Sequence, residues 1–280
     1  MNIKGKTVLL TGANGGIGAC VAYEMARAGA ALVLTGRDEN SLRQLRQSLH
    51  AADRHHTFVC DLQQSSGVNS LLEFCSALPA GIDLLVNNAG MSDFAFVSAA
   101  DPDVTRALIE LNLTAPITLT AAFLPHLLQR QEAAVINVGS VFGSIGYPGF
   151  AIYGASKSGL KTFSQALRRE LADSTVRVLY VAPRATRTAM NSSRVIAMNQ
   201  ALGNAMDPPE KVAKAIMQRI QTGHWGDIII GWPERLFAAI NSILPRLTDA
   251  VLLRQLPRIR QHSRVPAVQS NTLFDKREAI

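Results

Sequence analysis

The chain has 280 residues, of which 48% are hydrophobic and 18% charged, a composition that excludes disordered and fibrous proteins. Its 20 glycines and 12 prolines are ordinary numbers, which also excludes collagen-like and low-complexity sequences. The 28 lysines and arginines exceed the 21 acidic residues, and the net charge of +7 favours an anionic partner such as a phosphate-bearing cofactor, a lipid surface or nucleic acid.

The amino-terminal residues and the cysteines predict a soluble cytoplasmic protein. The chain opens with one short apolar run that glycine and asparagine interrupt, so we expect no signal peptide. The best candidate for a spanning helix, residues 111–129, contains two prolines, an asparagine and a histidine, and we do not expect it to cross a membrane. The three cysteines lack a CxxC pair and metal-ligand spacing, which fits reduced thiols and predicts no metal site; they are Cys20, Cys60 and Cys75.

Short runs rich in Val, Ile and Leu alternate along the chain with segments of helical spacing. Because these runs are continuously apolar, both faces of each strand should be covered, as in a parallel sheet. The sequence predicts one Rossmann-like, doubly wound α/β domain over residues 1–231, with about seven parallel strands, helices on both faces and a ligand crevice at the carboxyl ends of the strands. The predicted strands are residues 7–11, 31–35, 57–60, 82–86, 134–138, 176–181 and 227–230.

A glycine-rich turn follows the first strand directly and opens a helix. Residues 11–18 read TGANGGIG. Glycines in such a turn let backbone N–H groups approach a pyrophosphate, and the helix N-terminus adds partial positive charge. Glycine also collects in turns for steric reasons, so this segment alone leaves a dinucleotide site and a plain turn both open.

The end of the second strand bears on the choice of cofactor. Gly36 lies near the place where an acidic residue would accept the ribose hydroxyls of NAD, and Arg37 follows it. A guanidinium can bind a 2′-phosphate with two hydrogen bonds, so the sequence favours NADP(H) over NAD(H). Two alternatives stay open: Arg37 is a solvated loop residue, or Asp38 serves as the ribose-binding acid.

A tyrosine and a lysine lie four residues apart at the start of a long helical segment that reaches about residue 172. This spacing places Tyr153 and Lys157 on one helix face, although such pairs also arise by chance. At ~4 Å and an effective dielectric constant of ~20, their attraction is roughly 4 kcal/mol, which predicts a tyrosine pKa lowered by about 3 units from ~10. Such a phenol exchanges protons near neutral pH. Ser140, at the end of the fifth strand, either holds a substrate oxygen or serves as a turn residue.

Taken together, these motifs resemble those of the classical short-chain dehydrogenases/reductases. The matching features are TGxxxGxG at residues 11–18, NNAG at 87–90, the helix asparagine Asn112, Ser140, and YxxxK at 153–157, in order over about residues 5–231. The resemblance implies that Tyr153 protonates a carbonyl oxygen as hydride leaves the nicotinamide, or accepts the alcohol proton in reverse. It also implies that Lys157 lowers the tyrosine pKa and holds the nicotinamide ribose, that Ser140 orients the carbonyl, and that Asn112 anchors a water molecule leading to Lys157.

The resemblance further implies a set of cofactor contacts. Some come from the glycine turn, others follow the second, third, fourth and sixth strands, and two are the catalytic tyrosine and lysine. The implied contacts are Thr11, Gly12, Asn14, Gly16, Ile17, Gly18, Arg37, Asp61, Leu62, Asn88, Ala89, Gly90, Tyr153, Lys157, Pro183 and Thr188.

The sequence departs from the family pattern after the sixth strand, where Arg184 follows Pro183 in place of the usual glycine. An arginine beside the nicotinamide can contact a cofactor phosphate, contact an anionic substrate tail, or point outward. If the position requires a positive φ, the arginine also strains the backbone.

A second departure is the carboxyl-terminal extension, residues 232–280. Apolar residues recur in it at helical spacing, Pro245 should kink or divide the helix, and the segment past Pro266 should be weakly ordered. Residues 233–264 hold six arginines against two acidic residues, a net charge of +4. The extension is expected to be a basic amphipathic helical appendage of the domain, and its role as lid, peripheral membrane contact or subunit interface stays open.

We therefore expect an NADP(H)-dependent oxidoreductase that interconverts the carbonyl and secondary alcohol of a hydrophobic substrate, such as an acyl-chain or polyketide-like compound. By family habit, helices around Asn112 and Tyr153 would pair into a homodimer or homotetramer. The alternative is a non-catalytic NADP(H)-binding sensor or scaffold that docks partners or membranes through its extension, and the intact Ser140, Asn112, Tyr153 and Lys157 argue against it. Nucleic-acid binding is not expected, because aromatic residues do not alternate with the basic ones.

Overall fold

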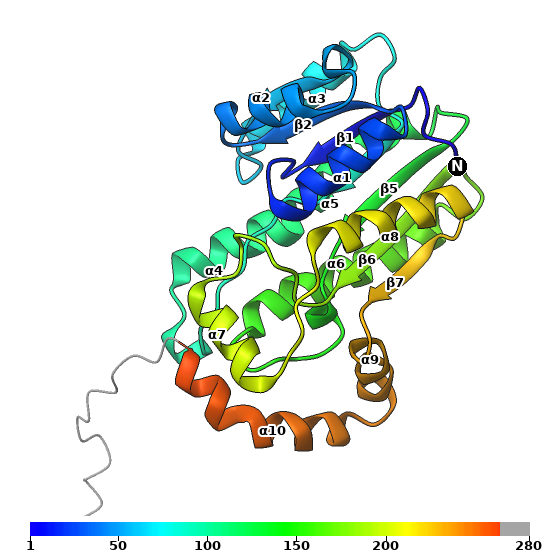
Figure 1. The fold of residues 1–280 in the computed structure, drawn as a ribbon. Coiled ribbons are helices and arrows are strands. Elements are labelled where there is room, and N and C mark those ends of the chain that lie inside the picture. Colours follow the sequence, from blue (N-terminus) through cyan, green and yellow to red (C-terminus); the bar gives the residue numbers. More distant parts are fainter. Residues whose placement is uncertain (264–280) are drawn as a thin grey trace, which may run out of the picture.

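The computed structural model describes residues 1–263, so the expectations for residues 264–280 lie outside the described residues. Its centre is one parallel seven-stranded sheet with the strand order β3-β2-β1-β4-β5-β6-β7 (Figure 1). This order and the parallel pairing confirm the predicted doubly wound sheet. The strands are β1 (Thr7–Thr11), β2 (Ala31–Gly36), β3 (His56–Val59), β4 (Leu84–Asn87), β5 (Ala133–Val138), β6 (Val176–Pro183) and β7 (Gly226–Ile230).

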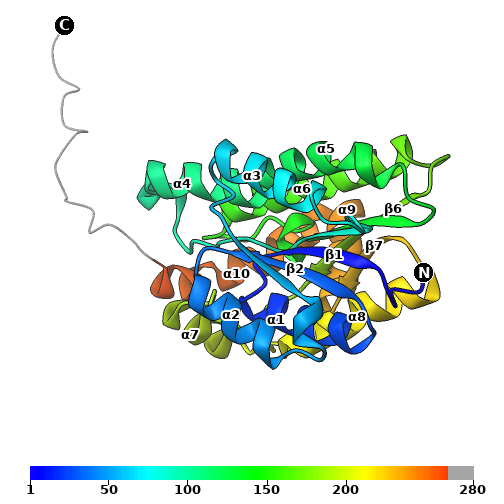
Figure 2. The same cartoon turned by 90° about the horizontal axis from the view of Figure 1, so that it is seen from above.

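Helices cover both faces of the sheet, as Figure 2 shows from above. One face carries α1 (Gly16–Arg27), α2 (Glu39–Ser48) and α8 (Pro209–Thr222), whose buried aliphatic side chains form one core cluster with the strands. The other face carries α3 (Ser65–Ser76), α5 (Ala115–Leu127) and α6 (Ala151–Glu170), which form a second cluster. The continuously buried strands explain why they read as unbroken apolar runs.

The remaining elements lie around the carboxyl edge of the sheet and in its connections. They are the helices α4 (Pro102–Ile109) and α7 (Ser193–Leu202), the 3₁₀ turns η1 (Ala52–Arg54), η2 (Val97–Ala99) and η4 (Val141–Gly143), and the π-helical turn η3 (Glu110–Thr114).

The continuous helical stretch Pro102–Leu127 has a mean hydropathy of 1.5 and is long and apolar enough, by length and composition, to cross a membrane. Core helices of globular domains pass the same test. Here Leu119, Phe123 and Leu127 pack into the second core cluster, and Asn112 is fully buried in the middle of the stretch.

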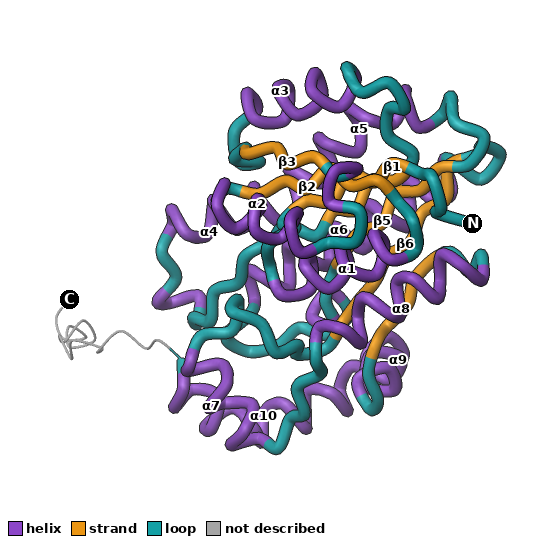
Figure 3. Tube along the Cα trace, turned by 45° about the horizontal axis from the view of Figure 1, so that its top comes forward, coloured by secondary structure: helices purple, strands orange, loops and turns teal. Residues whose placement is uncertain are grey.

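The carboxyl-terminal extension is helical, as expected. The helix α9 (Glu234–Ile243) ends before Leu244, and α10 begins at Pro245 and runs to His262, so the proline divides the two helices. The helix α10 packs against α7, and the two lie side by side in Figures 1 and 3. Ile259 of α10 is fully buried among Phe94, Phe150 and Met198, which joins the extension to the rest of the domain.

Candidate active site

A cleft of about 570 Å³ opens at the carboxyl ends of the strands. It lies between β1 and β4, where the strand order reverses, and parallel sheets of this type bind ligands at such a point. Every predicted site residue except Thr11 and Asn112 lines this cleft. The cleft also receives the apolar side chains of Phe142, Phe150 and Met198 and the side chain of Arg184.

The glycine turn forms the cleft wall at the start of α1. Gly12 has φ +59°, and a Cβ there would lie 2.8 Å from the Cα of Ala89, so β1 and β4 approach closely only because this residue is glycine. In the described structure no side chain caps the first turn of α1, and that turn holds no acidic residue. Its N–H groups therefore face the cleft as donors, which fits a pyrophosphate. Asn14, Gly16, Ile17 and Gly18 lie in the same wall.

Thr11 and Asn88 join the ends of β1 and β4. The Thr11 hydroxyl accepts hydrogen bonds from the N–H groups of Asn88 and Ala89, both at 3.0 Å, and the Asn88 amide donates to the carbonyls of Thr11 and Gly12 at 3.0 Å. Thr11 thus shapes the cleft from behind, while Asn88, Ala89 and Gly90 lie on its surface.

Arg37 is exposed at the end of β2 and lines the cleft, and its side chain has no ion-pair partner among residues 1–263. The neighbouring Asp38 caps α2, because its carboxylate accepts a hydrogen bond from the Ser41 N–H at 2.7 Å. This hydrogen bond holds the pKa of Asp38 below its usual value. The Asp61 carboxylate likewise accepts from the Gln63 N–H at 3.1 Å, beside Leu62 in the cleft.

Tyr153 and Lys157 project from the first turns of α6 into the cleft. The lysine ammonium lies 5.9 Å from the centre of the Tyr153 ring and donates a hydrogen bond to the Val138 carbonyl at 3.1 Å. Burial lowers the pKa of Lys157 to about 8, so the ammonium keeps its charge at neutral pH.

The predicted lowering of the tyrosine pKa is wrong for this structure. Burial raises the pKa of the Tyr153 phenol, and its hydrogen bond to Ser140 only partly opposes that shift. The expectation from the sequence placed the ammonium ~4 Å from the phenolate at an effective dielectric constant of ~20. Lys157 is instead buried and hydrogen-bonded to a backbone carbonyl. The burial of the phenol, which raises its pKa, therefore outweighs the electrostatic effect of the ammonium.

Ser140 lies at the start of η4, directly after β5. Its hydroxyl accepts from the Phe142 N–H at 3.2 Å and hydrogen-bonds to Tyr153, which places the two hydroxyls side by side in the cleft. The end of β5 and the first turns of α6 therefore converge at the cleft.

Tyr180 of β6 holds the backbone of Ser140 and Lys157, a contact that the sequence did not predict. Its buried hydroxyl donates to the carbonyls of Ser140 at 3.4 Å or Lys157 at 3.3 Å, and accepts from the Ser140 N–H at 3.4 Å. A Cβ at Gly139 would overlap this phenol, so the glycine before the serine makes room for the tyrosine. The sequence could have indicated this contact, because Tyr180 is the one tyrosine inside an otherwise mainly aliphatic strand.

Asn112 lies behind the cleft in η3 and is fully buried. Its side chain exchanges two 2.8 Å hydrogen bonds with the main chain of Met91 and donates to the Ser156 hydroxyl at 3.2 Å. These bonds fix the loop after β4 next to Lys157. The water molecule expected at Asn112 stays a prediction.

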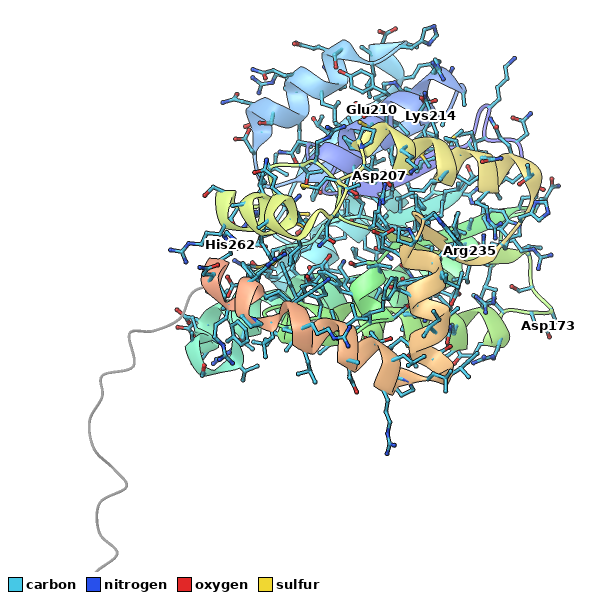
Figure 4. The ribbon with its side chains drawn as sticks, turned by 60° about the horizontal axis from the view of Figure 1, so that its bottom comes forward. Asp173, Asp207, Glu210, Lys214, Arg235 and His262 are labelled. Atoms are coloured by element: carbon cyan, nitrogen blue, oxygen red, sulfur yellow. The ribbon has the colours of Figure 1, made fainter. Side chains whose placement is uncertain are left out.

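Arg184 lines the cleft and does not point outward, which was one of the three roles left open. Its guanidinium lies 2.7 Å from the Asp207 carboxylate and 3.3 Å from the Glu234 carboxylate, with the arginine side chain only 13% exposed. Its φ is not positive, so the expected backbone strain is absent at this residue. Arg184 joins the end of β6, the base of the loop that carries α7, and the first turn of α9. Asp207 lies between α7 and α8 in Figure 4.

Pro183 ends β6 at the cleft, and the loop that follows brings Thr188 against Gly16 of the glycine turn. Backbone hydrogen bonds between Ala185, Arg187 and Asp207 close this loop at its base. The loop therefore forms a separate cleft wall that reaches from the end of β6 to the glycine turn.

A parallel sheet with a glycine-lined cleft and a paired serine and tyrosine above a buried lysine defines a nucleotide-dependent oxidoreductase. The chain belongs to the short chain dehydrogenase family, whose pattern matches residues 6–199. It is 38% identical over 179 residues to sulfoacetaldehyde reductase 2 of Chromohalobacter salexigens, covering 63% of this chain and 71% of that protein. It is 29% identical over 259 residues to the ketoacyl reductase HetN of Nostoc sp., covering 89% of this chain and 88% of that protein. A short chain dehydrogenase structure from Burkholderia cenocepacia in complex with NADP has a TM-score of 0.76 at 25% identity, covering 90% and 99%. The protein is thus an NAD(P)-dependent oxidoreductase of carbonyl and alcohol groups.

Proposed function

We propose that this enzyme is an NADP(H)-dependent reductase of hydrophobic ketones or aldehydes, which also oxidises the corresponding alcohols. The observation that carries the proposal is the pair of hydroxyls of Ser140 and Tyr153, joined by a hydrogen bond at the boundary between the glycine-lined and apolar ends of one cleft.

The chain's own residues supply the proton and the orientation. When bound, the nicotinamide cofactor supplies the hydride for reduction and accepts it for oxidation. Ser140 holds the carbonyl oxygen through its hydroxyl, and the Tyr153 phenol donates its proton to the same oxygen as negative charge develops there. The Lys157 ammonium, buried beneath the ring, stabilises the phenolate that remains.

The preference for NADP(H) rests on two residues after β2. Arg37 is exposed at the cleft with no ion-pair partner among the described residues, so its guanidinium is available to a 2′-phosphate. The Asp38 carboxylate already accepts the Ser41 N–H, which weighs against the ribose-binding role that would favour NAD(H).

The hydrophobic substrate is supported by the far end of the cleft. Phe142 and Phe150 stand edge-on to the Tyr153 ring, with centroids 6.4 and 6.2 Å away. Met91, Met190 and Met198 also line the cleft, and their flexible side chains fit an acyl chain or polyketide-like compound. The relative named as a ketoacyl reductase fits this class.

We further propose that the enzyme is a homodimer or homotetramer that pairs through the helices around Asn112 and Tyr153, as the family resemblance implies. Light scattering of the purified full-length chain tests this proposal, and a monomer at micromolar concentration would contradict it.

A panel of ketones, aldehydes and keto-acyl thioesters, each offered with NADPH and with NADH, tests the function. We expect turnover of apolar carbonyls, seen as loss of reduced-nicotinamide absorbance, with the higher kcat/KM for NADPH. Tight NADPH binding without turnover of any member would instead favour a sensor, and a higher kcat/KM with NADH would overturn the cofactor preference.

A further inference from the structure

The outer side of α9 and α10 carries large apolar side chains that lie open to solvent. Ile243 and Leu253 are 77% and 65% exposed, and Trp232, just before α9, is 69% exposed. Leu236, Leu244 and Leu247 are also exposed. We call these six residues the apolar ridge. Four of the six lie on the helices, Trp232 precedes α9 and Leu244 lies between the two. Six such residues close together along the chain exceed the single exposed leucines common on globular surfaces.

Arginines flank the apolar ridge. Arg235, Arg246, Arg254 and Arg258 are exposed, and none of them pairs with an acidic residue among residues 1–263. Within residues 232–263 the sequence has five arginines against Glu234 and Asp249, which leaves a charge of 5 − 2 = +3. Figure 4 looks toward this side of the molecule, with Arg235 on α9 and His262 at the end of α10.

We propose that the apolar ridge and its arginines dock the enzyme onto an anionic lipid bilayer, with α9 and α10 lying in the membrane interface. Apolar side chains beside unpaired arginines match a surface that presents acyl chains beneath phosphate groups. A second copy of this chain fits less well, because two positively charged surfaces would then meet.

The inner side of the same helices belongs to the apolar wall near the active site. Ile259 of α10 is buried in a cluster with Phe150 and Met198, both of which line the cleft, and Leu252 packs against that cluster. The membrane-facing helix α10 thus contacts side chains that themselves line the proposed substrate site. A hydrophobic substrate held in a bilayer would meet the cleft close to that surface. Docking itself does not depend on the proposed reductase activity.

Flotation of the full-length protein with vesicles tests the proposal. We expect the protein to float with vesicles that contain phosphatidylglycerol, to bind phosphatidylcholine vesicles at least about tenfold more weakly, and to dissociate in 0.5 M salt. Protein that stays in the soluble fraction with anionic vesicles overturns the proposal. Equal binding to both kinds of vesicle overturns the role of the arginines.

Two pairs of matched variants locate the binding surface. Ile243→Ser/Leu253→Ser should weaken vesicle binding about tenfold, whereas Val59→Ser/Leu128→Ser, which removes exposed apolar side chains elsewhere, should leave it unchanged. Arg246→Gln/Arg254→Gln/Arg258→Gln should weaken it at least tenfold. The control Arg54→Gln/Arg169→Gln/Arg177→Gln removes the same charge from other exposed positions. Equal losses within either pair contradict the assignment.

Trp232 provides a direct readout, since the chain has only one other tryptophan, Trp225. In the Trp225→Phe protein, the fluorescence of Trp232 should shift to shorter wavelength on binding anionic vesicles. Flotation without this shift would place the contact elsewhere on the protein. A change of oligomeric state in Ile243→Ser/Leu253→Ser, with vesicle binding unaltered, would show that the ridge joins copies of the chain and would overturn the proposal.

Discussion

The cofactor half of the cleft and its substrate half are built in different ways. The half proposed to hold the cofactor consists of strand ends and the turns that follow them. Two of its predicted contacts lie elsewhere: Thr11 is behind the cleft wall, and Thr188 is in the loop after β6. The substrate half consists of the loop after β6, α7 and α10, which pack through contacts between residues far apart in the chain. The comparison shows that contacts between adjacent strand ends hold the first half, including the side-chain bonds of Asn88 to Thr11 and Gly12. The second half depends on side-chain contacts among loops and helices outside the sheet.

Arg184 shows the difference most clearly. In the substrate half, one guanidinium ties together Asp207 and Glu234, which lie 23 and 50 residues further along the chain. In the cofactor half, the glycine turn needs only its own backbone and the adjoining end of β4. Disturbing Arg184 should therefore loosen the substrate half and leave the cofactor half intact.

The largest effect is expected from Arg184→Met. The substitution leaves the Asp207 and Glu234 carboxylates without their arginine, and it should lower the free energy of unfolding by about 3 kcal/mol, measured by urea denaturation. Asp207 keeps its ion pair with Lys211 at 3.0 Å, so Glu234 is the carboxylate left without an ion-pair partner among the described residues. Adding Glu234→Gln should therefore recover part of this loss. NADPH affinity should change little, and Arg177→Met serves as the exposed control. If the unfolding free energy of Arg184→Met lies within about 0.5 kcal/mol of that of the unaltered chain, Arg184 does not stabilise this part of the fold.

Lys157 should make stability depend on pH. Its pKa falls from 10.5 to about 8 on folding, so between these values the unfolded chain binds more protons than the folded one. The penalty for burying the charged lysine is complete below pH 8 and disappears as the pH rises toward 10.5, a gain on the order of 3 kcal/mol. Subtracting the unfolding free energy of Lys157→Met at each pH separates the contribution of Lys157 from that of other groups. If the unfolding free energies of the two proteins change in parallel with pH, this prediction is refuted.

Arg37→Ala tests the cofactor half at its most exposed residue. Loss of a charged hydrogen-bonding partner for the 2′-phosphate should weaken NADPH binding by about tenfold to a hundredfold and leave NADH binding unchanged. Arg43→Ala is the matched control, since that guanidinium already pairs with Glu39. Equal weakening of both dinucleotides by Arg37→Ala would exclude recognition of the 2′-phosphate.

The smallest effect is expected from Tyr180→Phe. Removing this buried hydroxyl should cost about 1 kcal/mol of stability and lower kcat about fivefold, because Ser140 and Lys157 lose a common partner. KM for NADPH should stay unchanged. Tyr23→Phe, which removes an exposed hydroxyl bonded to Ser48, is the control and should affect stability alone.

The strands and the glycine turn could be predicted because buried parallel strands read as unbroken apolar runs and a close turn requires glycine. The division of the extension at Pro245 could be predicted as well, since the first turn of a helix accommodates proline and the interior disfavours it. Pro257, which lies inside α10, shows that this preference is not absolute. The partners of Arg184 could not, because ion pairs across 23 or 50 residues leave no local pattern. The direction of the Tyr153 pKa shift could not be predicted for a related reason. Burial decides that direction, and only the folded structure reveals the burial.

The proton donated by Tyr153 is the central claim, and the kcat of Tyr153→Phe measures it most directly. With NADPH and any carbonyl compound that the unaltered enzyme reduces, we predict a loss of kcat of about a hundredfold to ten-thousandfold, with NADPH affinity and unfolding temperature unchanged. A kcat within about twofold of the unaltered enzyme would contradict the account, since general acid catalysis by this phenol would then contribute nothing measurable.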